Sequence, residues 1–272
     1  MSIREDAFSG KPIKCRIIDA HTHIKPVNGI GLYQGITTES EIVDLMDKLG
    51  IDCIVTAPHP ILAGMMSCAN KQAKEAIDNY PGRIYGYISI CPHDGIDAIK
   101  KELELYKNNS GFLGLKILSG YHGELDRKEF LYALDFADEM KCPVVFHKWN
   151  NSPGIESVRN VLETHRNLKL ICAHLGGGSS ECFYELNNLI KTYPNLFTDI
   201  CGSVFNSLDM GTVVETSGDD RIIYGSDLIY LDPRYDLGKI IFSTLSDDVK
   251  EKLLSSNYLS LLKDSQMGKI VF

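Results

Sequence analysis

Residues 17–23 have the sequence IIDAHTH, an apolar run that ends in two histidines separated by one residue. The pattern predicts a buried β-strand, and because successive strand side chains point to opposite faces, His21 and His23 share one face. Two imidazoles side by side at a strand end can bind one metal ion. A pair of hydrogen-bonded histidines at a strand edge would have the same local sequence. The rest of the chain therefore has to distinguish a metal site from such a pair.

Similar apolar segments recur along the chain, and their last residues are 26 to 34 positions apart. Segments with helical periodicity lie between them. Strands that alternate with helices predict a parallel sheet, and eight such units in about 250 residues are typical of a single-domain (β/α)8 TIM barrel. An open, doubly wound sheet is the alternative. The eight strands are predicted at residues 17–23, 53–57, 84–90, 112–118, 144–147, 168–174, 196–201 and 221–227.

The barrel is predicted to occupy residues 15–272, after a surface lead-in at 1–14 for which a short hairpin is one option. Residues 25–37 are rich in Gly and Pro and predict a loop. The next residues, TESE at 38–41, resemble a capping box and predict a helix that ends at Gly50. Further helices are predicted at 69–80, 95–107, 127–140, 154–165, 180–193 and 247–262.

Composition limits the classes of partner. The 272 residues carry a formal net charge of -8, which argues against a nucleic-acid or anionic-membrane surface. Eight scattered cysteines in so long a chain indicate reduced thiols, and the N-terminus has no apolar signal segment. We therefore predict a cytoplasmic protein with a small-molecule substrate, no nucleic-acid partner and no membrane partner. The sequence leaves a homodimer open.

Four of the eight predicted strands end in a residue that can bind a metal. In a TIM barrel these ends meet at one rim, where the active site lies. A polar group carried there on an apolar run is costly to bury unless it is paired or ligated. Each residue alone could be a hydrogen-bonded histidine or a helix cap, but together three imidazoles and a carboxylate suit zinc and related divalent ions. The residues are His21, His23, His147, His174 and Asp227.

These motifs resemble those of the amidohydrolase superfamily, in particular its amidohydrolase-related family of metal-dependent hydrolases and decarboxylases. The resemblance extends from about residue 17 to residue 262 and includes the order and spacing of the motifs. They are DAHTH at 19–23, His147, AHLGGG at 173–178 and YGSD at 224–227, with supporting matches at 80–83 (YPGR), 114–116 (GLK) and 257–262 (NYLSLL).

The resemblance implies that His21, His23, His147 and Asp227 bind one divalent ion, Zn2+ with Mn2+ as the alternative. It implies that His174 lies beside the ion as a catalytic or water-orienting group, and that Asp227 also takes part in catalysis. The chemistry agrees, because a divalent ion lowers the pKa of a bound water toward about 7. Asp227 could accept the proton of that water, and His174 could polarise the substrate.

Three further residues are candidates for substrate binding. Lys116 shares a strand face with Gly114 and is predicted either to bind substrate or to form an ion pair in the barrel core. A carboxylated lysine bridges two metals in other branches of the superfamily, but the branch resembled here has one metal, so we predict one ion per chain and an unmodified Lys116. Trp149 and Arg234 could hold a planar or anionic substrate, or only line the rim.

The other loop histidines are His59, His93 and His122, which follow the second, third and fourth predicted strands. Any one of them could line the pocket, but single loop histidines are more often solvated, so we predict that they lie outside the site.

The function that these expectations favour is hydrolysis of an ester, lactone or amide bond in a small molecule. The alternative is non-oxidative decarboxylation of an aromatic or unsaturated carboxylic acid, which the same residues serve in this family. Such decarboxylases tend to have longer loop insertions and arginines for a second carboxylate, whereas the loop predicted at 24–37 is short. A non-catalytic metal- or ligand-binding barrel is the third possibility, since fold does not dictate function. It is disfavoured because every catalytic position is filled.

Overall fold

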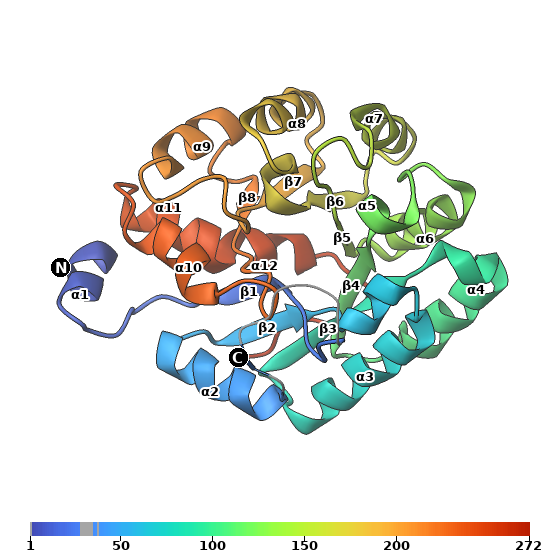
Figure 1. Ribbon diagram of the computed structural model, residues 1–272, viewed down its shortest axis with the longest axis horizontal. Coiled ribbons are helices and arrows are strands. Elements are labelled where there is room, and N and C mark those ends of the chain that lie inside the picture. Colours follow the sequence, from blue (N-terminus) through green and yellow to red (C-terminus); the bar gives the residue numbers. More distant parts are fainter. Residues whose placement is uncertain (1, 28–34, 37) are drawn as a thin grey trace.

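The computed structural model describes residues 2–27, 35–36 and 38–272. Its strands form one parallel sheet in the order β1 to β8, surrounded by helices (Figure 1). The predicted (β/α)8 barrel is thus confirmed, and the doubly wound alternative is wrong. The strands are β1 (Ile18–Thr22), β2 (Cys53–Thr56), β3 (Ile84–Ile90), β4 (Phe112–Ile117), β5 (Pro143–Phe146), β6 (Lys169–Cys172), β7 (Leu196–Asp199) and β8 (Ile222–Ile223).

The last strand meets the first through backbone hydrogen bonds. The N–H of Ala20 donates to the carbonyl of Tyr224 at 3.0 Å, and the N–H of Asp227 donates to the carbonyl of His21 at 2.8 Å. A further parallel bridge joins Thr22 to Leu228. This closure places the segment after β8 directly beside the histidines of β1.

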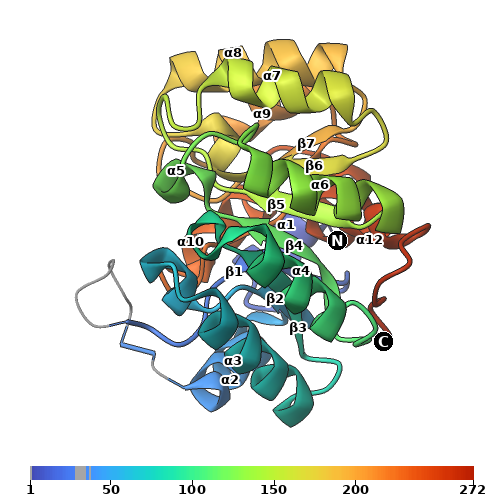
Figure 2. The same cartoon turned by 90° about the vertical axis from the view of Figure 1, so that its right-hand side faces the viewer.

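The helices lie outside the strands, as the two perpendicular views show (Figures 1 and 2). The segments α9, α10, η1 and α5 were not predicted. The helical elements are α1 (Ile3–Phe8), α2 (Glu39–Leu49), η1 (His59–Ala63), α3 (Met66–Asn79), η2 (Pro92–Asp94), α4 (Gly95–Tyr106), α5 (Ser119–His122), α6 (Lys128–Met140), α7 (Ile155–Thr164), η3 (Ala173–Gly176), α8 (Ser180–Thr192), α9 (Met210–Ser217), α10 (Pro233–Ile241), α11 (Asp247–Glu251), the π-turn η4 (Lys252–Ser256) and α12 (Asn257–Leu262).

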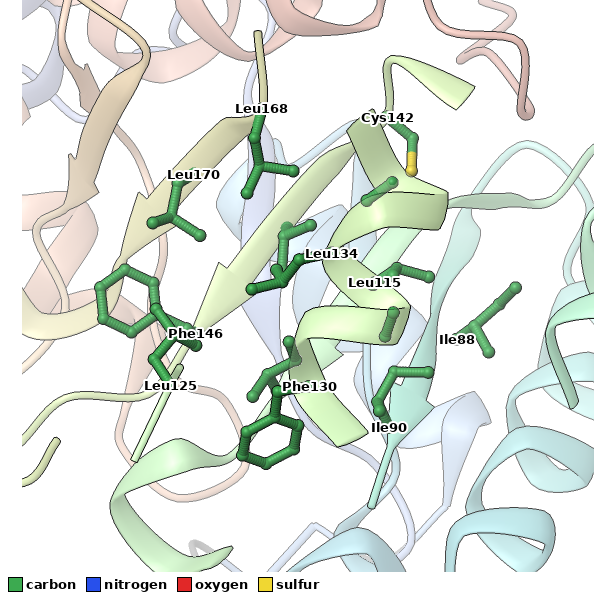
Figure 3. Close-up of a cluster of buried hydrophobic side chains, with 14 of the residues drawn as sticks. Ile88, Ile90, Leu115, Leu125, Phe130, Leu134, Cys142, Phe146, Leu168 and Leu170 are labelled. Atoms are coloured by element: carbon green, nitrogen blue, oxygen red, sulfur yellow. The ribbon is translucent and has the colours of Figure 1, made fainter. Parts of the chain in front are cut away.

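Apolar side chains fill the layer between strands and helices. Figure 3 shows part of it, where Phe130 and Leu134 of α6 face Leu115 of β4 and Phe146 of β5. All four are fully buried, and burying a side chain of this size contributes roughly 1.5–3 kcal/mol. These contacts hold the strand ends in fixed positions, which is what the site requires.

Two expectations for the chain ends are corrected. Residues 3–8 form a helix instead of a hairpin, because Ser2 and Glu5 make a capping box that satisfies the first N–H groups. The helix predicted at 247–262 is interrupted by a π-turn at Lys252–Ser256. The capping box of α2 at Thr38 and Glu41 is as predicted. Most of the loop predicted at 25–37, namely residues 28–34 and 37, lies outside the described residues.

All eight cysteines are free, and six are buried, whereas Cys15 and Cys68 are half-buried. In the part of the chain that the structure describes, no helix has both the length and the apolar character needed to span a membrane.

Candidate active site

Every residue predicted at the strand ends lies at the carboxyl end of its strand. His21 belongs to β1, while His23, His147 and Asp227 follow β1, β5 and β8. His174 lies in η3, directly after β6. The strands β6 and β8 end at Cys172 and Ile223, earlier than predicted, and His174 and Asp227 have φ values of 62° and 57°, in the left-handed region. Such conformations are costly for non-glycine residues and are typical of functional sites.

Three of the predicted ligands form a compact group. The Nε2 atoms of His21 and His23 lie 3.6 and 3.2 Å from Oδ1 of Asp227. One donor atom from each residue lies within 4.8 Å of the other two, and all three side chains are buried. Imidazole nitrogen and carboxylate oxygen are the donors that first-row divalent ions prefer.

Both histidines are held in the tautomer that a metal ligand needs. Nδ1 of His21 lies 2.7 Å from Oδ2 of Asp199, and Nδ1 of His23 lies 2.6 Å from the carbonyl oxygen of Ala57. Since these oxygens only accept, both Nδ1 atoms donate and both Nε2 atoms keep a lone pair. Metal-binding histidines almost always have such a partner on the other nitrogen. The residues present therefore fit a divalent ion.

Electrostatics also favour the neutral, ligating form of the histidines. Burial, assisted by the nearby Lys116 ammonium, lowers the pKa of His23 and of His147 to about 3. Burial likewise holds the pKa of His21 and of His174 well below the usual range. Neutral imidazole is the form that binds metal, so no proton has to be displaced from these rings at neutral pH.

Asp199 and Cys201 are functional neighbours that the sequence analysis does not identify. Oδ1 of Asp199 accepts from the backbone N–H of His174 at 2.8 Å, and Sγ of Cys201 lies 3.0 Å from Nδ1 of His174. A signal is present in the segment LFTDIC at 196–201, where an acid interrupts an apolar run. The predicted strand extends to Cys201, whereas β7 ends at Asp199.

His147 contacts His174 more closely than it approaches the compact group. Its Nδ1 lies 3.0 Å from Nε2 of His174, and the two rings are nearly perpendicular, at 75°. Among the described residues His147 is not part of the three-donor group, so its role as a fourth ligand stays a prediction.

Lys116 extends into the barrel mouth, in the direction that strand alternation indicates. Its side chain is 1% exposed, and Nζ lies 2.5 Å from Nε2 of His21. Burial lowers the pKa of this lysine, while the carboxylates of Asp227 and Asp199 oppose that shift. The Lys116 amine therefore lies against the same Nε2 atom of His21 that a bound ion would use.

A cavity of about 500 Å³ opens above these residues. Aromatic rings form part of its wall: the Trp149 ring lies 5.6 Å from that of His174, and the Tyr121 ring lies 5.0 Å from that of His147. The lining residues are Gly120, Tyr121, His147, Trp149, His174, Gly202, Ser203, Asp227, Tyr230 and Leu231.

Arg234 is not brought to this cavity. Its guanidinium donates to both oxygens of Asp232 at the start of α10 and lines a separate surface pocket with Ala7 and Lys11. Lys148, next to Trp149 in the sequence, is buried and donates to the carbonyls of Asn150 and Pro153, which fixes its loop. Neither side chain lines the cavity, so neither is placed to bind a substrate there.

His59 is expected from the sequence to be solvated, and the structure corrects this. It is fully buried in η1, its ring lies 5.1 Å from that of His23, and neither ring nitrogen has a hydrogen-bond partner among the described residues. The apolar sequence around it (APHPIL at 57–62) is a signal of this burial.

A sequence model described as amidohydrolase matches residues 18–262, nearly the whole chain. The chain belongs to this amidohydrolase family. No curated protein sequence matches it.

Solved structures with the same fold include two decarboxylases with similar levels of likeness. The 2,6-dihydroxybenzoate decarboxylase from Rhizobium has a TM-score of 0.72 and 15% identity, covering 92% of this amidohydrolase and 99% of the other chain. The 5-carboxyvanillate decarboxylase from Sphingomonas paucimobilis has a TM-score of 0.71 and 14% identity, covering 93% and 100%.

A third relative has a metal in its structure. The dihydroxybenzoic acid decarboxylase from Polaromonas sp. JS666, with bound manganese and the inhibitor 2-nitroresorcinol, has a TM-score of 0.70 and 15% identity, covering 92% of this chain and 97% of its own. At such identities the likeness shows the fold. The family membership shows an enzyme of the amidohydrolase superfamily.

Proposed function

We propose that this amidohydrolase-family enzyme is a metal-dependent, non-oxidative decarboxylase of a planar aromatic or unsaturated carboxylic acid. The observation that carries the proposal is the buried group of His21, His23 and Asp227, of which Asp227 lines a cavity with aromatic residues in its wall. The decarboxylases with the same fold support it, and they favour this reaction over the hydrolysis that the sequence favours.

The cavity suits a flat anionic substrate. Trp149 and Tyr121 offer ring faces or edges on which a planar molecule can pack, and such aromatic contacts contribute roughly 0.5–1.5 kcal/mol each. The Lys116 side chain lies beside His21 and, together with a divalent ion, would offset the carboxylates of Asp199 and Asp227. A filled site therefore accepts a negatively charged group.

Metal ion and side chains have separate roles in the proposed reaction. A bound divalent ion would hold and polarise the substrate's oxygen atoms. The bond between the substrate carbon and its carboxylate breaks, the electron pair stays on that carbon, and carbon dioxide leaves. A proton then replaces it, so no oxidant or reductant is consumed. His174, which faces the cavity with Nε2 near His147, is the candidate to deliver that proton, and Asp227 is the candidate to hold the substrate geometry.

The experiment is to incubate manganese- or zinc-loaded protein with a panel of hydroxybenzoic acids and to measure released carbon dioxide against loss of the acid. We expect equal amounts of both with at least one member. Metal-stripped protein is the matched control and should be inactive.

Hydrolysis is the second candidate, because no arginine is found among the described residues that line the cavity. In that case a metal-activated water would attack an ester, lactone or amide, with Asp227 accepting its proton. A parallel panel of lactones and esters decides between the two. Cleavage of these with no release of carbon dioxide from any acid would overturn the decarboxylase proposal.

A further inference from the structure

A second cluster of metal-binding side chains lies apart from the barrel-mouth histidines. Cys91 directly follows β3, His93 lies in η2, and His122 is the last residue of α5. One donor atom from each lies within 4.8 Å of the other two. Cys91 is buried and His93 is exposed, as expected of a loop histidine, whereas His122 is buried and corrects the expectation that it is solvated. The cluster is thus anchored in the fold and open to solvent on one side.

The donors of this cluster are available for an ion. Nε2 of His122 lies 2.9 Å from the carbonyl oxygen of Ile61, so Nε2 donates and Nδ1 keeps its lone pair. This is the arrangement that orients metal-binding histidines elsewhere. Burial lowers the pKa of His122, which favours its neutral ring. Cys91 is a free thiol whose pKa burial raises, so the ion itself would have to stabilise the thiolate. The His93 and His122 rings are perpendicular, at 88° with 5.1 Å between centroids, and one donor atom of each lies within 4.8 Å of the other and of Sγ of Cys91.

We propose that Cys91, His93 and His122 bind a second divalent ion, of the borderline-soft class to which zinc belongs, with water as the remaining ligand. One sulfur and two imidazole nitrogens are typical zinc donors, and they disfavour magnesium, calcium and manganese, which prefer oxygen. Tetrahedral bonds of about 2.0–2.3 Å require donors about 3.5 Å apart. The three donor atoms lie within 4.8 Å of one another, so binding would require the exposed His93 to move toward the two buried donors. Binding displaces one proton, from the Cys91 thiol to water.

The position of the cluster gives the ion a role in shaping the active site. It joins the segments that follow three neighbouring strands: η1 through Ile61, η2 through His93 and α5 through His122. The same α5 contributes Gly120 and Tyr121 to the cavity wall, and η1 contributes His59, whose ring packs against His23. An ion here would fix one wall of the cavity without touching the substrate.

The competing explanation is an edge-to-face histidine pair beside a buried thiol, with no ion. The two explanations differ in ion count and in thiolate ligation. The sequence predicts one ion per chain from the barrel mouth alone, and the second cluster raises the expected number at saturation to two.

The experiment loads the metal-free full chain with Co2+, because a cysteine thiolate bound to cobalt gives a charge-transfer absorption band in the near ultraviolet. Ions per chain are counted by elemental analysis of the same samples. We expect two ions and the band in the natural protein. His93→Ala, an exposed position that folding does not need, should keep one ion and lose the band. His21→Ala should lose the barrel-mouth ion and keep the band.

Two cysteine variants test which thiol is bound. Cys91→Ser should remove the band, whereas Cys68→Ser, a half-buried cysteine of α3 outside the cluster, should keep it. Cys201 needs its own variant because its sulfur lies near His21 and His174 in the barrel mouth. Absence of the band in the natural protein, or a band that Cys201→Ser removes and His93→Ala keeps, would overturn the proposal. Neither result depends on which reaction the barrel mouth catalyses.

Discussion

The carboxylate of Asp199 connects three parts of the site. Oδ2 holds Nδ1 of His21, while Oδ1 accepts from the backbone N–H of His174 and lies 2.9 Å from Sγ of Cys201. A single side chain thus sets the tautomer of a metal ligand and the position of the catalytic candidate. Charged hydrogen bonds of this kind are shorter and stronger than neutral ones.

Asp199→Asn should therefore weaken metal binding without unfolding the protein. An amide holds the His21 ring less firmly, and loss of such a partner typically costs about 10–100-fold in metal affinity. A chelator-competition titration measures the affinity. The control is Asp220→Asn at an exposed position, which should bind metal as the natural protein does. Equal affinities in the two variants would contradict the assigned role of Asp199.

His174→Asn should separate catalysis from metal binding. If His174 transfers a proton and does not bind the ion, the variant keeps its metal and loses about 10²–10⁴-fold in kcat. Metal content and turnover are measured on the same preparation. His147→Asn is the comparison, because its predicted ligand role implies loss of metal. Should His174→Asn lose the ion as readily as His147→Asn, then His174 is itself a ligand.

Lys116→Ala should leave the barrel-mouth ion count unchanged and raise the KM for a carboxylate substrate, because a buried basic group beside His21 is removed from the site. Counting ions in a His93→Ala background keeps the second cluster out of the measurement. Lys116→Met, which retains length without charge, separates loss of charge from loss of packing. A fall in barrel-mouth ions in both variants would indicate that the lysine bridges or supports metals.

The turn after β6 is the element that brings His174 toward the fifth strand. Gly177 has a φ of 125°, and a Cβ there would lie 2.6 Å from the backbone N of Asn150 and 3.1 Å from Cα of Trp149. The segment after β6 therefore passes against the segment that carries Trp149, and only glycine permits that approach.

Gly177→Ala should destabilise the protein by roughly 1–3 kcal/mol, because the overpacked backbone must shift, and it should lower kcat as Trp149 and His174 move apart. Thermal melting and turnover measure the two effects. Gly211→Ala is the matched control. Gly211 lies in α9, and a methyl group added there would have nothing within 4 Å, so alanine should be neutral or stabilising by up to about 1 kcal/mol. Equal behaviour of the two variants would show that the close approach is unimportant.

At the scale of the whole molecule, the barrel core is independent of the metal residues. The apolar layer between strands and helices is built without the candidate barrel-mouth ligands, so we expect the fold to form without an ion there. Small zinc domains differ in this respect, because in them metal binding and folding are one process.

Chelation should consequently remove the metal and activity while the far-ultraviolet circular dichroism stays unchanged. Metal at 100 times its Kd should restore about 2.7 kcal/mol of stability, seen as a rise of several degrees in Tm. Calcium at the same concentration is the control, because histidine sites bind it poorly. Collapse of the dichroism signal on gentle chelation would show that the ion is part of the folding core.

The sequence by itself determined the barrel and the residues of its rim. Strand and helix periodicity are local properties, so their alternation predicted eight βα units, and the carboxyl-end rule then placed His21, His23, His147, His174 and Asp227 together. The tertiary structure alone decided the contacts between side chains far apart in the chain. Asp199 forms a hydrogen bond with His21, and the ring of His59 packs against that of His23. Arg234 donates to Asp232. The periodicity of the sequence indicates which face of a strand or helix a residue occupies. It does not indicate which side chain the residue contacts, because that depends on how the loops, which have no regular period, cross the barrel rim.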